Sequence, residues 1–211
     1  WQGLNCTIPY KQDLVGLVDE LRPNAARIGA VNTLLHGQDG RIIGDNTDLF
    51  GFAWMFARFC ERHLGARDAL RGAKALVLGS GGASKAIVAA LEDVSATPVV
   101  ISRHGDDTYE TIAERHADAS LIVNTTPVGM YPNCPATPLV PGTIERLAPL
   151  RGVIDVVYNP ERTGIMLDAD RLGIPAESGL VMLVGQAWLS SSMWQDRELD
   201  EGLIGSIEGE L

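Results

Sequence analysis

The hydrophobic pattern of the chain alternates between short apolar runs and longer stretches in which apolar residues recur at helical spacing. Four apolar runs have the length of buried strands, at 74–78, 97–102, 120–124 and 153–158, and a short fifth begins at 174. Helical spacing occurs at 83–91, 162–172 and 179–194, and 107–116 is polar and partly helical. Strands that alternate with helices predict an α/β fold with a parallel, doubly wound sheet.

The first part of the chain has a different pattern. An apolar stripe predicts a helix over 12–21 that ends at Pro23, and the runs 28–35 and 41–44 predict two strands joined by a turn at Asp39-Gly40. A further apolar helix is expected over 51–59, and 65–67 is a polar hinge. Taken alone, Lys11 is typical of a solvated lysine and Asp48 of a helix cap.

A glycine-rich turn stands between the strand at 74–78 and the helix at 83–91. Gly79 would allow a tight turn, and Gly81 would let a pyrophosphate approach the backbone, where the helix N-terminus supplies free N–H groups. Ser84 stands where the third glycine of G-x-G-x-x-G is usual. The turn predicts a Rossmann-type dinucleotide site; the alternative is an ordinary glycine-rich connection.

Composition restricts the class of partner and compartment. The 211 residues suffice for one large or two small domains, and the net charge of −10 argues against a nucleic-acid partner. No apolar run approaches the ~18 residues of a membrane span. The three cysteines are few and widely spaced, so we expect no disulfide framework and no metal site, and a cytoplasmic location.

Seven stretches carry a further signal. They are 3–11 (GLNCTIPYK), 29–33 (GAVNT), 44–51 (GDNTDLFG), 79–84 (GSGGAS), 124–130 (NTTPVGM), 155–160 (DVVYNP) and 179–187 (GLVMLVGQA). In this order they resemble the motifs of the shikimate dehydrogenase family, including its quinate-using relatives. The resemblance covers nearly the whole chain, and Cys6 departs from it where the family usually has valine.

The resemblance implies a domain organisation. It assigns 1–51 to a substrate-binding α/β domain, 52–186 to an NADP-binding Rossmann domain, and 187–211 to a helical segment that packs back on the substrate domain. The family begins with two βα units before this point, so about 60 residues would be missing at roughly 30 per unit. We therefore expect an incomplete substrate domain, and a chain that binds NADP but turns over shikimate poorly.

The family reaction is the reversible, NADP-linked interconversion of 3-dehydroshikimate and shikimate. The resemblance implies that Lys11 and Asp48 carry the proton step, in which the carboxylate orients the ammonium. Asp48 would also bind a ring hydroxyl. The other implied substrate residues are Thr7, Asn32, Tyr158 and Gln186.

Cofactor choice is read from the end of the second strand of the predicted sheet. Ser102 and Arg103 stand where an NAD site usually has an acidic residue, and an arginine suits a 2′-phosphate, so NADP is favoured. The glycine turn supplies Gly79, Ser80, Gly81, Gly82 and Ala83. Further cofactor-binding positions implied by the resemblance are Asn124, Thr125, Thr126, Val157, Gly179 and Met182.

Other functions stay open at this point. The alternatives are a quinate/shikimate dehydrogenase that uses NAD, an enzyme such as the methylenetetrahydrofolate dehydrogenases, and a non-catalytic dinucleotide-binding module. The GDNTD and NTTPVGM stretches count against the second of these. The partner is expected to be a small molecule, with no nucleic acid and no membrane, and the protein a monomer or a homodimer.

Overall fold

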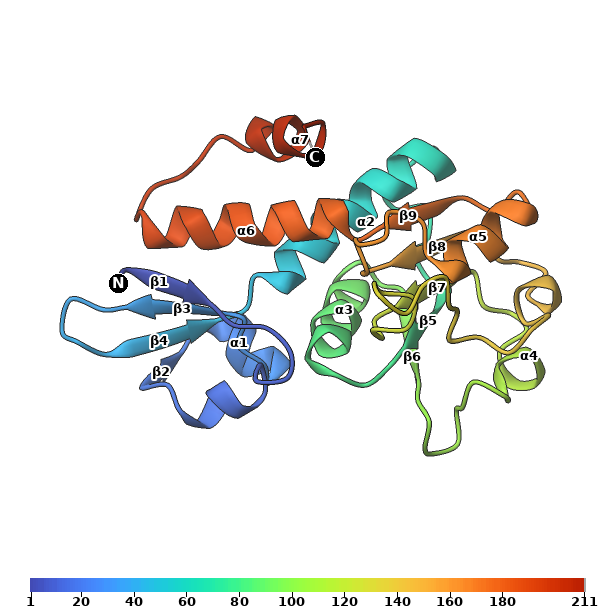
Figure 1. Ribbon diagram of the computed structural model, residues 1–211, viewed down its shortest axis with the longest axis horizontal. Coiled ribbons are helices and arrows are strands. Elements are labelled where there is room, and N and C mark those ends of the chain that lie inside the picture. The colour runs from blue at the N-terminus through green and yellow to red at the C-terminus, as the bar shows by residue number, and fades with distance from the viewer. Residues whose placement is uncertain (211) are drawn as a thin grey trace.

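The structure is a computed structural model that describes residues 1–210, and it contains two sheets with long helices between them (Figure 1). The smaller sheet has the order β1-β3-β4-β2, with bounds Gly3–Asn5, Thr33–His36, Ile42–Asp45 and Glu20–Leu21. β3 pairs antiparallel with both β1 and β4, whereas β2 is parallel to β4. The predicted turn at Asp39-Gly40 joins β3 to β4.

The larger sheet confirms the predicted α/β fold. Its five strands are all parallel in the order β6-β5-β7-β8-β9, with bounds Thr97–Ile101, Lys74–Leu78, Leu121–Asn124, Gly152–Asp155 and Ala176–Ser178. The connections contain α3 (Gly82–Asp93), α4 (Ile112–Arg115), a 3₁₀ turn η2 (Ile144–Arg146) and α5 (Gly164–Arg171). The stretch 131–142 contains no helix or strand.

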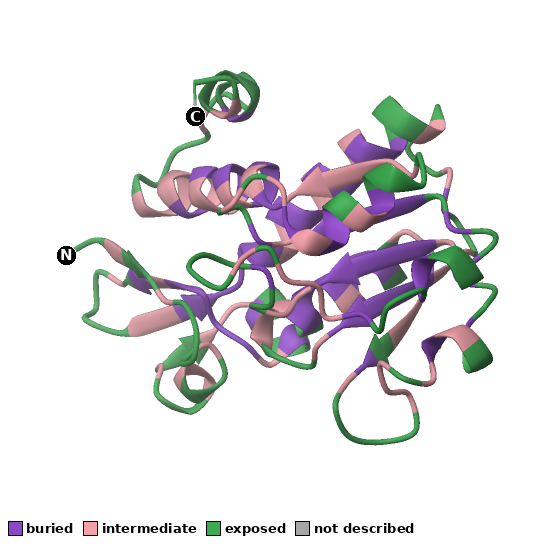
Figure 2. Cartoon of the chain, turned by 45° about the vertical axis from the view of Figure 1, so that its right-hand side comes forward, coloured by how far each residue is buried: buried purple, intermediate pink, exposed green. Residues whose placement is uncertain are grey.

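Both faces of the larger sheet are covered, which explains why its central strands β5, β7 and β8 are mostly apolar. In β5, Ala75 and Val77 point into a core formed with α2 (Asp48–Leu64) and α3. Leu76 and Leu78 point the other way, into a core that includes Ile165 of α5. Figure 2 shows the central strands β5, β7 and β8 almost entirely buried, with exposed residues on the outer helix faces.

Two helices link the sheets. α2 leaves the smaller sheet and packs on the larger one, and α6 (Leu180–Trp194) returns along α2 (Figure 1). At its end, Trp194 Nε1 donates a hydrogen bond of 3.1 Å to the carbonyl of Leu34 in β3. α7 (Gly202–Glu208) then places Ile204 against Trp188. The end of α6 thus packs on the smaller sheet, while the boundaries 1–51, 52–186 and 187–211 stay predictions.

The expectation of a helix over 12–21 is wrong. The stretch 12–21 forms only a 3₁₀ turn, η1 (Asp13–Gly16), before β2, and the helix α1 (Pro23–Ile28) begins at the proline expected to end one. Proline is favoured in the first helical turn because the backbone N–H that it lacks would have no hydrogen-bond partner within the helix. The amide of Asp19 instead donates to the carbonyl of Ile42, so this stretch is drawn into the sheet beside β4.

Two features of the described residues bear on the class of partner. Within residues 1–210, no helix combines the length and the apolar character that crossing a bilayer requires. The same residues contain no group of histidine, cysteine and carboxylate side chains arranged to hold a metal ion. Cys6, Cys60 and Cys134 are all free thiols.

Candidate active site

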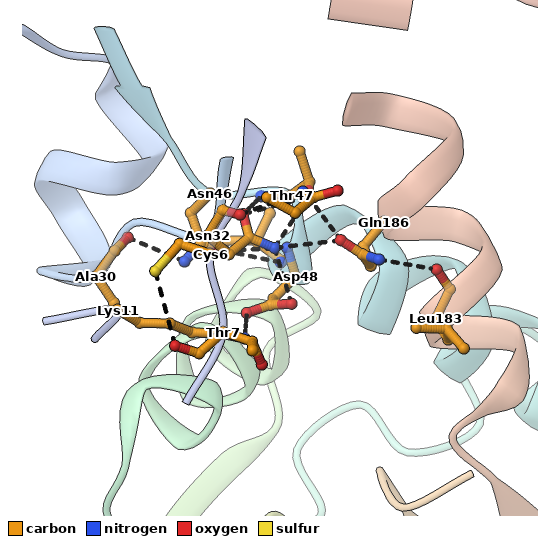
Figure 3. A network of polar contacts seen from close by, with 12 residues as sticks. Cys6, Thr7, Lys11, Ala30, Asn32, Asn46, Thr47, Asp48, Leu183 and Gln186 are labelled. Atoms are coloured by element: carbon orange, nitrogen blue, oxygen red, sulfur yellow. Dashed lines mark hydrogen bonds and ion pairs between the residues drawn. The ribbon is translucent and has the colours of Figure 1, made fainter. Parts of the chain in front are cut away.

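A lysine and an aspartate form a shielded ion pair beside the smaller sheet (Figure 3). Lys11 lies on the loop after β1, and Asp48 is the first residue of α2. Lys11 Nζ donates a hydrogen bond of 2.8 Å to Asp48 Oδ2, and the two side chains are 13% and 6% exposed. Because little water reaches the pair, the carboxylate fixes the direction in which the ammonium points.

Asn32 holds the second oxygen of the same carboxylate. Asn32 Nδ2 donates to Asp48 Oδ1 at 3.0 Å, and Asn32 Oδ1 accepts a bond of 2.7 Å from the amide of Thr47. The amide of Asp48 donates to Asn46 Oδ1 at 3.1 Å, so Asn46 satisfies the start of α2. The interpretation of Asp48 as a helix cap is therefore wrong, because its two oxygens face side chains.

Gln186 reaches this cluster from α6. Its Oε1 lies 3.4 Å from both Asn32 Nδ2 and Thr47 Oγ1, and its Nε2 donates to the carbonyl of Leu183 at 3.1 Å. Figure 3 shows the glutamine pointing from α6 toward Asn32 and Thr47. Residues far apart in sequence are thus brought into one polar cluster around Asp48.

Thr7 and Tyr158 lie near the surface. Thr7 is exposed on the loop that also carries Lys11 (Figure 3), and Tyr158 is half exposed after β8. Within residues 1–210, neither side-chain hydroxyl has a hydrogen-bond partner, so both are available to a small molecule.

A cavity of about 640 Å³ lies against this site and reaches the glycine turn. Lys11 lines it together with Gly79, Ser80, Gly81, Gly82 and Ala83. Gly79 has φ +102°, a conformation that a side chain disfavours, and a Cβ there would lie 3.0 Å from Thr125 Oγ1. A Cβ on Gly81 would meet only open space, so this backbone is accessible from the cavity at the start of α3.

Ser102 and Arg103 line the same cavity beyond the end of β6. In the part of the chain that the structure describes, no carboxylate lies within ion-pairing distance of Arg103. Tyr109 is beside it; burial raises the pKa of this phenol, and the charge of Arg103 opposes that shift. The arginine is an unpaired cation in a cavity, which favours an anionic ligand.

The remaining predicted cofactor residues divide into two groups. Thr125 and Thr126 line the cavity. Asn124, Val157, Gly179 and Met182 are not in its wall. Asn124 is fully buried, and Gly179 packs against the backbone of Val156 with no room for a Cβ. The role of these four residues as direct cofactor contacts stays a prediction.

Sequence reasoning missed several residues of the site. Tyr109 lines the cavity from a stretch that reads only as polar and partly helical, and Pro138 and Gln12 lie far from the glycine turn in sequence. Asn46 could have been found from the sequence, since polar side chains just before a helix usually satisfy its free amides, as Asn46 does for the amide of Asp48.

Comparison with known proteins identifies relatives of this arrangement. A family model described as shikimate dehydrogenase substrate binding domain matches residues 1–34. The NADP(+) shikimate dehydrogenase of Clostridium beijerinckii is 34% identical over all of this chain and 79% of its own length. A crystal structure of shikimate dehydrogenase 1 from Peptoclostridium difficile has 36% identity and a TM-score of 0.87 over 99% of this chain and 77% of that one.

A third similar protein has a crystal structure with bound ligands. It is the crystal structure of shikimate 5-dehydrogenase from Thermus thermophilus in complex with NADP(H) and shikimate. It is 30% identical, with a TM-score of 0.80, over all of this chain and 79% of that chain. Both the smaller and the larger sheet of the present structure therefore lie within the aligned region.

Proposed function

The chain belongs to the shikimate dehydrogenase family, and we propose that Lys11 and Asp48 carry the proton step of its reaction. The protein is an NADP-dependent oxidoreductase that interconverts 3-dehydroshikimate and shikimate, a reaction of the shikimate pathway. The observation that supports the two residue roles is that Lys11 pairs with Asp48 while lining the same cavity as the glycine turn.

The cavity fits NADP. Open space over Gly81 and the N-terminus of α3 suit a pyrophosphate, and the unpaired Arg103 with Ser102 suits a 2′-phosphate. Thr125 and Thr126 would line the wall between these two parts of the cofactor. When bound, NADP accepts or supplies the hydride of the reaction.

The protein's own contribution to the chemistry is a proton held at Lys11 Nζ. In the direction of reduction, the ammonium donates a proton to the oxygen that was the carbonyl of the substrate. In the direction of oxidation, the neutral amine accepts the proton of the hydroxyl. Asp48 Oδ2 keeps the nitrogen in one place throughout, and Asn32 prevents the carboxylate from turning away.

The substrate ring is placed over the polar cluster. Asn32, Asp48 and Gln186 present amide and carboxylate groups that match ring hydroxyls. The hydroxyls of Thr7 and Tyr158, which have no hydrogen-bond partner among residues 1–210, are available as well. On this assignment residues 1–51 form the substrate domain, 52–186 form the NADP domain, and 187–211 form a segment that packs back on the substrate domain. Lys11 packs closely against Gly82, since a Cβ on Gly82 would lie 3.1 Å from Lys11 Cβ.

Location and assembly extend this proposal. Three free thiols suit a reducing compartment, so the protein is assigned to the cytoplasm, as a monomer or a homodimer. Gel filtration with light scattering measures the oligomeric state, and an assembly larger than a dimer would contradict the proposal.

Steady-state turnover tests the function. The assay follows reduced cofactor with shikimate or quinate as substrate and NADP or NAD as acceptor, and it also tests the expectation that turnover is slow. Shikimate with NADP is expected to give the highest kcat/KM of the four combinations. A higher value for quinate with NAD would favour the alternative enzyme, and NADP binding without any turnover would favour a non-catalytic module.

A further inference from the structure

A fully buried carboxylate that the proton step does not use lies at the end of β8. Asp155 has no exposed surface and accepts three hydrogen bonds. Asn124 Nδ2 and the amide of Val157 both donate to Oδ1 at 3.0 Å, and Thr163 Oγ1 donates to Oδ2 at 2.6 Å. Asp155 thus ties the end of β7, the segment after β8 and the start of α5 to one point.

The contact with Asp155 is the shorter of two bonds that fix which way the Asn124 amide faces; the other runs from Nδ2 to the carbonyl of Val128 at 3.4 Å. Asn124 is itself fully buried, and its Nδ2 points at Asp155, so its Oδ1 must point the other way. On that side, Oδ1 accepts bonds from the amide of Thr126 at 3.0 Å and from Thr126 Oγ1 at 2.7 Å. If the side-chain amide turned over, Nδ2 would face the backbone N–H of Thr126, and two donors would oppose each other.

The segment held in this way is a wall of the cofactor cavity. Residues 125–128 all line it, and Thr126 Oγ1 accepts a further bond of 3.2 Å from the amide of Val128. The same segment leans on the glycine turn: Thr125 Oγ1 donates to the carbonyl of Leu78 at 2.6 Å, next to Gly79. Asn124 Nδ2 also donates a bond of 3.4 Å to the carbonyl of Val128. Among the described residues, Asp155 therefore reaches the 125–128 wall through Asn124, at Thr126 and at Val128.

We propose that Asp155 is a positioning residue for the dinucleotide: by fixing the side-chain amide of Asn124, it sets the 125–128 wall in the shape that NADP requires. The proposal rests on the proposed function of the cavity as the NADP site. Neither residue lines the cavity, so the effect on binding passes from Asn124 to the wall residues Thr126 and Val128.

Two substitutions at the same position separate orientation from bulk. Asp155→Ala removes the nearer acceptor of Asn124 Nδ2, and the dissociation constant for NADP is expected to rise about tenfold, the equivalent of one ordinary hydrogen bond. Asp155→Asn should restore most of the affinity. The introduced carbonyl oxygen can accept from Asn124 and Val157, while its NH₂ can donate to the Thr163 hydroxyl, which accepts equally well.

Thr163→Val is the matched control for general loosening. It removes the bond to Asp155 Oδ2, on the side of the carboxylate away from Asn124, and Thr163 does not line the cavity. This variant should lose thermal stability while keeping the dissociation constant for NADP. An equal loss of NADP affinity in Thr163→Val and Asp155→Ala would overturn the proposal, because the effect would then come from disorder alone.

The measurement is a fluorescence titration of NADP into each folded variant, with the melting temperature recorded beside it and the KM for shikimate measured where turnover allows. Failure of the unchanged protein to bind NADP would contradict the function of the cavity. Normal binding by the unchanged protein and by Asp155→Ala would contradict only the positioning role. A higher dissociation constant for NADP in Asp155→Ala, with the KM for shikimate unchanged, supports the positioning role.

Discussion

Gly51 of α2 and Gly185 of α6 lie backbone to backbone. A Cβ on Gly185 would be 3.2 Å from Gly51 Cα, and a Cβ on Gly51 would be 2.5 Å from the carbonyl oxygen of Met182. The two helices approach this closely because neither has a side chain at the crossing. The crossing brings Gln186 of α6 within 3.4 Å of Asn32. The packing of α2 on α6 therefore places Gln186 in the polar cluster around Asp48.

The first prediction concerns this crossing. Gly51→Ala places a methyl group against backbone that cannot move without shifting α6, and overpacking of this kind costs about 1–3 kcal/mol of unfolding free energy. Urea unfolding checks the value. Gly16→Ala is the control, since a Cβ there meets nothing within 4 Å. If the two variants were equally stable, the helices would be packed less closely than described.

The second prediction concerns cofactor choice. Arg103→Ala should weaken NADP binding by about 1.5–3 kcal/mol, the range of hydrogen bonds to charged groups, and leave NAD binding nearly unchanged. Arg146→Ala is the control, because Arg146 Nε donates to the carbonyl of Gly142 away from the cavity. Titration of both nucleotides measures the difference. A parallel loss for NADP and NAD would show that Arg103 does not contact the 2′-phosphate.

The third prediction concerns pH. Burial raises the pKa of Asp155 above the ordinary 3.8, although its three hydrogen bonds partly oppose this shift. The native state therefore holds this proton to higher pH than the unfolded state. The stability that the protonated group contributes is fully present below 3.8 and is lost as pH rises through the raised pKa.

Asp155→Asn has no such proton to lose. Relative to the unchanged protein, its unfolding free energy should rise as pH increases from 3.8 through the raised pKa. Urea unfolding at several pH values measures both proteins. A difference between them that stays constant across this range would mean that Asp155 titrates like an exposed carboxyl.

The sequence predicted the parts of the fold that rest on local pattern. The strand at 74–78, the glycine turn and the helix after it follow one another in a single short segment, and they occur as expected. The stretch 12–21 has a helical apolar stripe, but pairing beside β4 satisfies its backbone instead. This pairing depends on β4, which lies further along the chain, so the apolar periodicity of 12–21 alone gives no information about it.

The site shows the same division. Lys11 and Asp48 are predicted from the sequence because both lie in motifs of the family. The sequence favours Asp48 as the helix cap, whereas Asn46 makes the capping bond, because both residue types are suitable caps. Tyr109 and the buried Asp155 could not be found from spacing. Their roles depend on which strand ends meet at one edge of the sheet.

The central claim is that the Lys11–Asp48 pair carries the proton step. Its most direct test is the kcat of Lys11→Ala for shikimate with NADP, beside the control Lys74→Ala, whose lysine pairs with Asp118 on the larger sheet. Lys11→Ala should lower kcat by about 10²–10⁴-fold, the usual contribution of a positioned acid–base group, while NADP still binds. Lys74→Ala should keep its kcat. A Lys11→Ala protein with the kcat of the control would contradict the account.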